Sequence, residues 1–194
     1  MPLSRPLIGL TLFYSLIFVF SAIAPTSRAV WFAEIIPAIL VLATICVVSL
    51  RWSMSTTAYV LMFWLCLHTI GAKYTFAEVP FDWFNTLIGS TRNQFDRVAH
   101  FSIGLYAYPI AEWLLRKQQT KPWLAYSFAL FSLMSLAAAY EIIEWWYAAL
   151  ACGEEGIAFL GSQGDIWDAQ KDMLCDTLGA ITALCLLAWQ RARG

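Results

Sequence analysis

Charged residues are scarce in this 194-residue chain, since Asp, Glu, Lys and Arg together make up 13% of it, about half the share of a soluble domain. Hydrophobic residues make up 60% instead. So little charge excludes a nucleic-acid-binding protein, a disordered chain and an ordinary soluble enzyme. The five cysteines form no CxxC pair and lie mostly in apolar runs, so we expect neither a disulfide framework nor a zinc site. The composition predicts a membrane protein.

Long apolar runs predict an all-α transmembrane bundle of about six spans. The third run is the weakest, because His68 and Lys73 lie in its second half. Spans of about 20 residues use more than half of the chain, so we expect a single membrane domain over residues 1–194. The predicted spans are residues 7–24, 30–50, 56–74, 98–115, 123–140 and 173–189.

Six spans place both termini on one side of the membrane. Seven of the twelve cations lie on that side, which favours a cytoplasmic location for the termini. The acids are distributed differently, because Glu112 alone lies toward the termini and the other twelve lie in or beside the opposite ends of the spans. Two long connections on that opposite side, about 75–97 and 141–172, contain aromatic residues and are predicted to lie at the membrane surface. The polar half of the chain, about 68–183, is therefore the expected site.

Histidine and carboxylate residues recur at helical spacing near the outer ends of the spans. Asp96 and His100 are four residues apart and share a helix face, an arrangement that fixes the tautomer of an imidazole and raises its basicity. Glu141 and Glu144 are three residues apart at the end of the fifth span. We predict that these four side chains are catalytic.

A stripe of aspartates leads into the sixth span at steps of three, four and four. An acid at the bilayer centre costs ~2.5–3.5 kcal/mol on insertion scales, which makes a solvated surface a poor explanation for Asp172 and Asp176. Such groups persist when they protonate, pair with cations or bind a metal, and both are predicted to be catalytic as well. Oxygen ligands suit Mg²⁺, Mn²⁺ or Ca²⁺, so we predict a divalent cation at Asp165, Asp168 and Asp172.

Each of these groups also has a structural interpretation. Asp96 and His100 can interact with the dipole at a helix N-terminus, and the two glutamates can form structural hydrogen bonds. Asp165 and Asp168 can belong to a solvated loop. His68 is better explained by packing than by function.

Three strings, residues 96–101, 141–145 and 161–173, resemble the YjdF-type family of bacterial inner-membrane proteins, and the likeness extends over most of the chain. A more distant likeness to VanZ-like membrane proteins covers about residues 96–183. This sequence departs from the VanZ-like pattern at Arg97, where lysine is usual, and at Asp176, where asparagine is usual. The VanZ-like residues present are Asp96, His100, Tyr140, Glu141, Asp172, Gly179 and Ala180.

These resemblances imply a helical bundle in the bacterial inner membrane with a polar site at its outer face. VanZ-like proteins are associated with resistance to a lipid-like glycopeptide antibiotic, and a wider grouping is proposed to act on lipid headgroups. Neither resemblance implies a specific reaction.

The leading hypothesis is an enzyme that acts on a lipid headgroup or a lipid-linked phosphate, with a membrane lipid rather than a nucleic acid as its partner. His100 would be the general acid or base, and a divalent cation would assist. The predicted substrate-binding residues are Arg92, Arg97, Lys171 and Gln163. Two alternatives stay open: an ion-coupled transporter that uses the acidic stripe as a path, and a non-catalytic membrane protein that binds a lipid or a partner.

Overall fold

The computed structural model describes residues 5–52, 54–116, 120–151 and 153–193, and these residues form helices joined by short loops. The predicted all-α membrane bundle is confirmed. Lys117 and Cys152, which entered the charge and cysteine counts above, lie outside the described residues. The helices are α1 (Arg5–Ala22), α2 (Arg28–Arg51), α3 (Thr56–Met62), α4 (Leu65–Lys73), α5 (Asp82–Leu87), α6 (Phe95–Gly104), α7 (Ala107–Arg116), α8 (Pro122–Ala151), α9 (Gly153–Leu160) and α10 (Asp168–Arg193).

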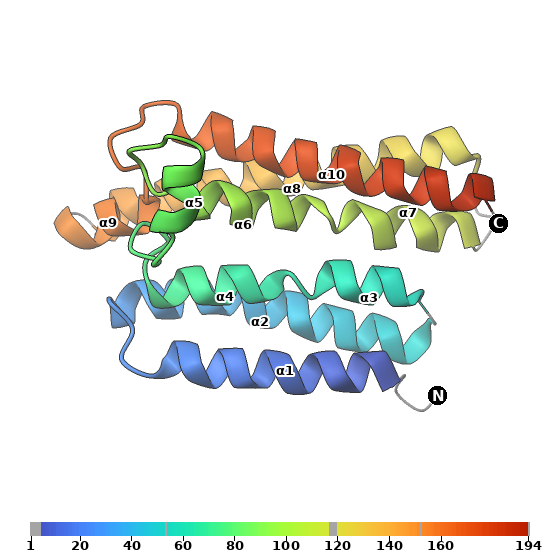
Figure 1. Cartoon of the computed structure of the whole chain (residues 1–194), viewed down its shortest axis with the longest axis horizontal. Helices are drawn as coiled ribbons and strands as arrows, with labels where there is room; N and C mark the ends of the chain where they lie inside the picture. The colour runs from blue at the N-terminus through green and yellow to red at the C-terminus, as the bar shows by residue number, and fades with distance from the viewer. Residues whose placement is uncertain (1–4, 53, 117–119, 152, 194) are drawn as a thin grey trace.

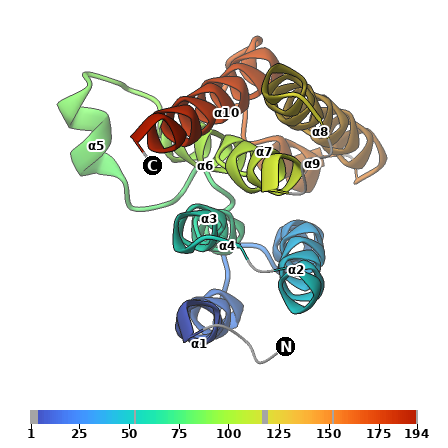
Figure 2. The ribbon, with the colours of Figure 1, turned by 90° about the vertical axis from the view of Figure 1, so that its right-hand side faces the viewer.

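The long helices run side by side along one axis, with both termini at the same end and with α5 and α9 at the opposite end (Figure 1). Seen end-on, α1 to α4 form one group, and α6, α7, α8 and α10 form the other (Figure 2). Within the described ranges, four helices, α1, α2, α8 and α10, are long and apolar enough to cross a membrane. The pairs α3–α4 and α6–α7 each cover one predicted span in two pieces. We call the end that carries α5 and α9 the loop end.

The α6–α7 pair is interrupted because of a proline. Pro109 is the third residue of α7 and has no N–H with which to bond the carbonyl of Leu105, one turn earlier. That carbonyl accepts a tighter hydrogen bond from the Tyr108 N–H instead, at 3.1 Å. Residues 105–106 therefore form a tighter turn, with hydrogen bonds between residues three apart, before the helix continues as α7.

The α3–α4 break faces this tighter turn. The Cys66 N–H bonds to the Phe63 carbonyl at 3.1 Å and so leaves the carbonyl of Met62 without its usual helical donor. The hydroxyl of Tyr106 donates to that carbonyl at 2.6 Å. Tyr106 thus satisfies the carbonyl that is freed at the α3–α4 break, and this hydrogen bond ties the N-terminal group of helices to the C-terminal group.

Lys73, at the end of the weak third span, has a structural partner. Its ammonium group donates to the carbonyl of Ile23 and lies 4.7 Å from the centre of the Phe20 ring. The Thr26 N–H in turn donates to the Lys73 carbonyl at 2.9 Å. The lysine therefore closes the end of α1, which accounts for a cation in an otherwise apolar run.

Two glycines set the distance between α6 and α10, which both begin at the loop end and run in the same direction. A Cβ atom on Gly179 would lie 2.0 Å from the carbonyl oxygen of Phe101, and one on Gly104 would lie 2.0 Å from the carbonyl oxygen of Asp176. Neither position accepts a larger residue without a shift of backbone. This close contact brings the first turns of α6 beside the first turns of α10.

The predicted end of the fifth span is wrong. α8 continues to Ala151, so the first part of the predicted 141–172 loop is helical, and α9 then packs back against α8. The ring centres of Tyr147 and Phe159 lie 4.1 Å apart across this contact. Trp145 and Trp146 are more than half exposed on the extension. The apolar, helix-forming sequence therefore continues beyond Glu141 and Glu144, where the fifth span was predicted to end.

Candidate functional site

Three carboxylates surround His100 at the loop end of the α6–α10 contact. Asp176 Oδ2 lies 3.0 Å from His100 Nδ1. On the other side of the ring, Nε2 lies 3.6 Å from Asp96 Oδ1 and 4.0 Å from Asp172 Oδ1. All four side chains are nearly buried. The structure thus brings together four of the predicted catalytic residues from two helices.

This cluster forms part of the wall of a cavity of about 320 Å³. His100, Asp96, Asp176 and Glu144 supply acids and an imidazole, and most of the remaining wall is apolar. Asp176 is 1% exposed, and its Oδ1 atom has no hydrogen-bond partner among the described residues. A buried carboxylate oxygen without a donor is costly, so this atom marks a place where a ligand group would be stabilised.

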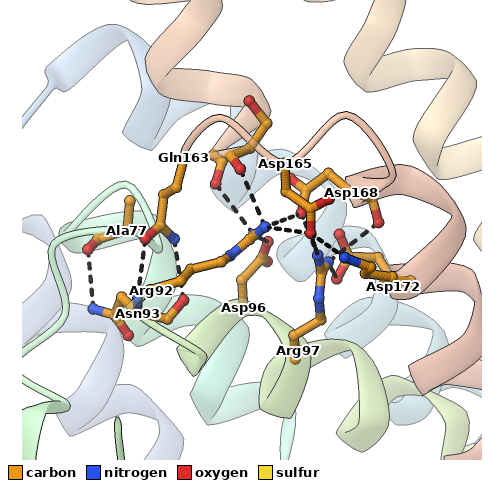
Figure 3. Close-up of polar contacts among 12 residues, drawn as sticks. Ala77, Arg92, Asn93, Asp96, Arg97, Gln163, Asp165, Asp168 and Asp172 are labelled. Atoms are coloured by element: carbon orange, nitrogen blue, oxygen red, sulfur yellow. Dashed lines mark hydrogen bonds and ion pairs between the residues drawn. The ribbon is translucent and has the colours of Figure 1, made fainter. Parts of the chain in front are cut away.

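Two arginines cover the cluster on the side of the loops (Figure 3). Arg92 lies 3.4 Å from Asp165 and 3.8 Å from Asp96, and Arg97 lies 3.3 Å from Asp165. Both guanidinium groups pair with Asp168, and Arg97 also pairs with Asp172. The arginines predicted to bind substrate are therefore already paired with acids.

The predicted metal ligands separate into two sets. All three have guanidinium partners, as described above, but Asp172 differs from Asp165 and Asp168 in that it also faces His100. Among the described residues, the group of side chains whose ligand atoms lie within 4.8 Å of one another is Asp96, His100 and Asp172. A cation that uses Asp172 would thus be shared with α6 rather than with the start of α10.

Lys171 and Asp165 form the outermost ion pair of the network. The Lys171 ammonium lies 2.7 Å from Asp165 Oδ2, and the lysine side chain is 53% exposed. The hydrogen bond from Lys171, together with one from the Trp167 N–H, lowers the pKa of Asp165 below its ordinary value. The carboxylate therefore stays ionised at the surface of the site.

Gln163 joins the two loops that cover the cluster (Figure 3). Its side chain accepts from the Asn93 N–H at 3.0 Å and donates to the Asn93 carbonyl at 3.1 Å. The amide of Asn93 then donates to the carbonyls of Ala77 and Val79. Gln163, predicted to bind substrate, lies here in a position that holds the loops together.

The two glutamates of α8 face the same region. Glu144 is buried and contributes to the cavity wall. Glu141 lies close enough to interact electrostatically with His100, and its Oε1 atom is buried without a hydrogen-bond partner among the described residues. Both glutamates are therefore placed beside the cluster from a third helix.

A second polar group reaches the same cavity through His68 and Tyr140, which line it, and its acid, Glu34, was not predicted as a site residue. Glu34 of α2 is 1% exposed and accepts a hydrogen bond of 2.6 Å from the hydroxyl of Tyr140. His68 Nε2 lies 3.1 Å from the same Glu34 oxygen. The ring of Tyr140 stands between the two histidines, 6.0 Å from His68 and 6.3 Å from His100. A lone acid in the apolar run of α2 was the signal available in the sequence.

Comparison with known proteins assigns the chain to a family. A family model described as "Predicted membrane protein (DUF2238)" matches residues 6–193. The chain belongs to this family. It is 36% identical over 181 residues to the inner membrane protein YjdF of Escherichia coli (strain K12), which covers 90% of this chain and 85% of that protein. No solved structure matches the chain.

The expected resemblance to YjdF-type proteins is thereby confirmed, and the protein is an integral membrane protein. The likeness to VanZ-like proteins stays a prediction. In this member of the DUF2238 family, the ion-pair network around His100 contains five aspartates and three Arg or Lys residues among the described residues. With every aspartate ionised and His100 neutral, this network has two excess negative charges. Two protons or one divalent cation would neutralise that excess.

Proposed function

We propose that this protein is a metal-assisted enzyme of the bacterial inner membrane that cleaves a phosphoester at the headgroup of a membrane lipid. The observation that carries the proposal is the position of His100, which has carboxylates at both ring nitrogens and lies in the wall of a largely apolar cavity. An apolar cavity with a few converging polar groups is typical of a ligand site.

The set of Asp96, His100 and Asp172 would hold the divalent cation. His100 would bind through Nε2, while Nδ1 donates to Asp176 and so fixes the ring and its tautomer, as second ligand shells do around metals. One divalent cation matches the two unbalanced charges of the network. Bound there, it would supply charge stabilisation to the phosphate oxygens.

The residues of this chain then have defined tasks in hydrolysis. The oxygen of a water molecule forms the bond to phosphorus, the bond from phosphorus to the alcohol oxygen breaks, and the alcohol leaves. Glu144 takes the proton from the water and returns it to the departing oxygen, so that the carboxylate is regenerated. Arg92 and Arg97 act mainly by holding the aspartates, because their guanidinium groups are already paired.

A one-sided site supports this proposal over an ion-coupled transporter. The carboxylates gather at the loop end, and Glu112, a buried acid near the other end, accepts the Ser55 N–H and pairs with Arg116. The positive residues beside the termini support cytoplasmic termini, with which the site would lie at the outer face. The inner-membrane location of the similar YjdF supports that membrane for this chain.

The test is metal binding and lipid cleavage by purified protein in vesicles. The vesicles contain phosphatidylethanolamine, phosphatidylglycerol and a polyprenyl diphosphate, and phosphorus NMR follows cleavage with and without Mg²⁺ or Mn²⁺. Binding of Mn²⁺ is measured separately by electron paramagnetic resonance. We expect Mn²⁺ binding at about one ion per chain and metal-dependent loss of one lipid phosphorus signal.

Two variants complete the experiment. Asp96→Asn removes a proposed ligand and is expected to lose both Mn²⁺ binding and cleavage. Asp82→Asn removes an exposed acid at the same end of the bundle and is expected to keep both. Wild-type protein that binds no Mn²⁺ and cleaves none of these lipids would contradict the proposal.

A further inference from the structure

A second cavity adjoins the site and extends toward the opposite end of the bundle. It measures about 630 Å³ and reaches Trp113 of α7. Four residues line both this space and the polar cavity, so the two cavities adjoin each other. Hydrocarbon side chains form most of the wall, and the hydroxyl of Tyr106 is already bonded to Met62. The shared residues are Leu40, Val41, Ile103 and Leu136.

The second cavity, which we call the groove, is open on one side to the surroundings of the bundle. It lies between α2 and α8, which pack on other helices: α2 contacts α4 and α9, and α8 contacts α7, α9 and α10. Leu40, Phe128 and Leu136 line the groove and are each more than half exposed. In a membrane, the surroundings at this depth are lipid chains, so a chain can enter the groove sideways.

An empty apolar groove of this size is unfavourable, because its lining side chains lose their dispersion contacts on one side. Its volume lies in the range of ~300–1,000 Å³ that ligand pockets occupy. Water would not fill it, since the wall offers few polar partners. Hydrocarbon is the filling that matches both the wall and the surroundings.

We propose that this groove binds one hydrocarbon chain of the lipid whose headgroup occupies the cavity beside His100. The identity of the lipid headgroup rests on the proposed function. The amphiphilic pattern of the space favours a lipid over a helix from a second copy. A lipid presents a polar group to Asp176 and a continuous apolar chain to the groove, whereas a packed helix would leave Asp176 Oδ1 without a partner.

Photo-crosslinking tests the groove without any need for turnover. The full-length protein is placed in nanodiscs of phosphatidylethanolamine and phosphatidylglycerol that contain a trace of phosphatidylethanolamine with a diazirine at the end of one acyl chain. After irradiation without added metal, mass spectrometry locates the labelled residues. We expect labels on groove residues such as Val48, Ile110 and Phe128, well above those on the outward-facing residue Val47 of α2.

A matched pair of variants on α2 blocks the groove or leaves it open. Val41→Trp places an indole where the two cavities join, and labelling of the groove is expected to fall several-fold. Val47→Trp adds the same side chain on an exposed position that lines neither cavity, and labelling of the groove is expected to stay as in the wild type. Thermal unfolding of both variants checks that each is folded.

Three results would overturn the proposal: equal labelling of Val47 and the groove residues, groove labelling that survives Val41→Trp, or protein–protein crosslinks through the groove. Its failure can be separated from failure of the enzyme hypothesis. If the groove residues are labelled in both the wild type and His100→Asn, and the wild type cleaves no lipid, the groove binds a hydrocarbon chain and the proposed reaction is wrong. Cleavage of lipid without labelling of the groove residues would support the enzyme and contradict the chain-binding groove.

Discussion

Asp176 Oδ2 lies 3.0 Å from His100 Nδ1, although 76 residues separate the two in the sequence. The contact exists because Gly104 and Gly179 let α6 and α10 approach until backbone touches backbone. Two small residues, one or more turns deeper in the bundle, thus determine the geometry of the charged cluster above them.

Enlarging Gly179 should therefore disturb both stability and site. We expect Gly179→Ala to lower the free energy of unfolding by ~1–3 kcal/mol, the usual cost of overpacking. The measurement is unfolding of the purified protein in detergent. Gly9→Ala is the control, because a Cβ atom on Gly9 meets nothing within 4 Å, and it is expected to be neutral or slightly stabilising. Equal effects of the two substitutions would show that α6 and α10 are not in close contact.

The two kinds of cation in the network should differ in their importance. Arg97 is 10% exposed and pairs with Asp165, Asp168 and Asp172. Arg97→Gln therefore leaves the buried Asp172 without a guanidinium partner, whereas Arg92 still pairs with the other two aspartates. We expect a loss of ~3–5 kcal/mol in the free energy of unfolding, as for other broken buried pairs. Lys171→Gln removes only a half-exposed partner and should cost less than ~1 kcal/mol. Similar unfolding midpoints for the two variants would contradict the buried network.

Asp165 provides a prediction about pH. Because its pKa is lowered in the folded protein, its ionised form contributes stability above the ordinary value of 3.8, and that contribution is lost as the pH falls through the lower folded value. Lys171→Gln removes the largest cause of the lowering. We expect the pKa of Asp165 to return toward 3.8 in that variant, as measured by NMR of the carboxyl carbon. An unchanged titration would show that the ion pair does not form.

Glu34, His68 and Tyr140 should behave as one unit. Tyr140 and His68 both contact the same oxygen of Glu34. Removing one contact therefore alters the contribution of the other to the free energy of unfolding. A double-mutant cycle of Tyr140→Phe and His68→Gln is expected to give a coupling energy of ~0.5–3 kcal/mol in unfolding experiments. The control cycle combines Tyr140→Phe with Arg116→Gln, at the other end of the bundle, and should be additive within ~0.5 kcal/mol. Coupling in both cycles would point to a general loss of folding.

Much of the fold could be predicted because apolar runs of membrane length define helices directly. Asp96 and His100 could be paired from their spacing, since residues four apart share a face in any helix. The extension of α8 could not be predicted in this way, because Glu141 and Glu144 interrupt the run yet turn toward the site. Local spacing shows which residues share a face of one helix but not what that face meets.

The partners of the aspartates illustrate that limit. Asp165, Asp168 and Asp172 form one stripe in the sequence and all pair with arginines, yet only the third of them also faces His100. From the sequence alone, His68 was expected to be a packing residue. Its partner, Glu34, comes from another helix. Contacts of this range depend on how the helices pack, which composition and spacing leave open.

The central claim is that buried carboxylates from α10 hold the imidazole of His100. The chain has two histidines, so nitrogen NMR of histidine-labelled protein in nanodiscs gives signals from His68 and His100 alone, and His68→Gln assigns them. We predict that Asp176→Asn shifts the Nδ1 signal of His100 and leaves His68 unchanged. A His100 signal that matches free imidazole in water and does not respond to Asp176→Asn would contradict the account.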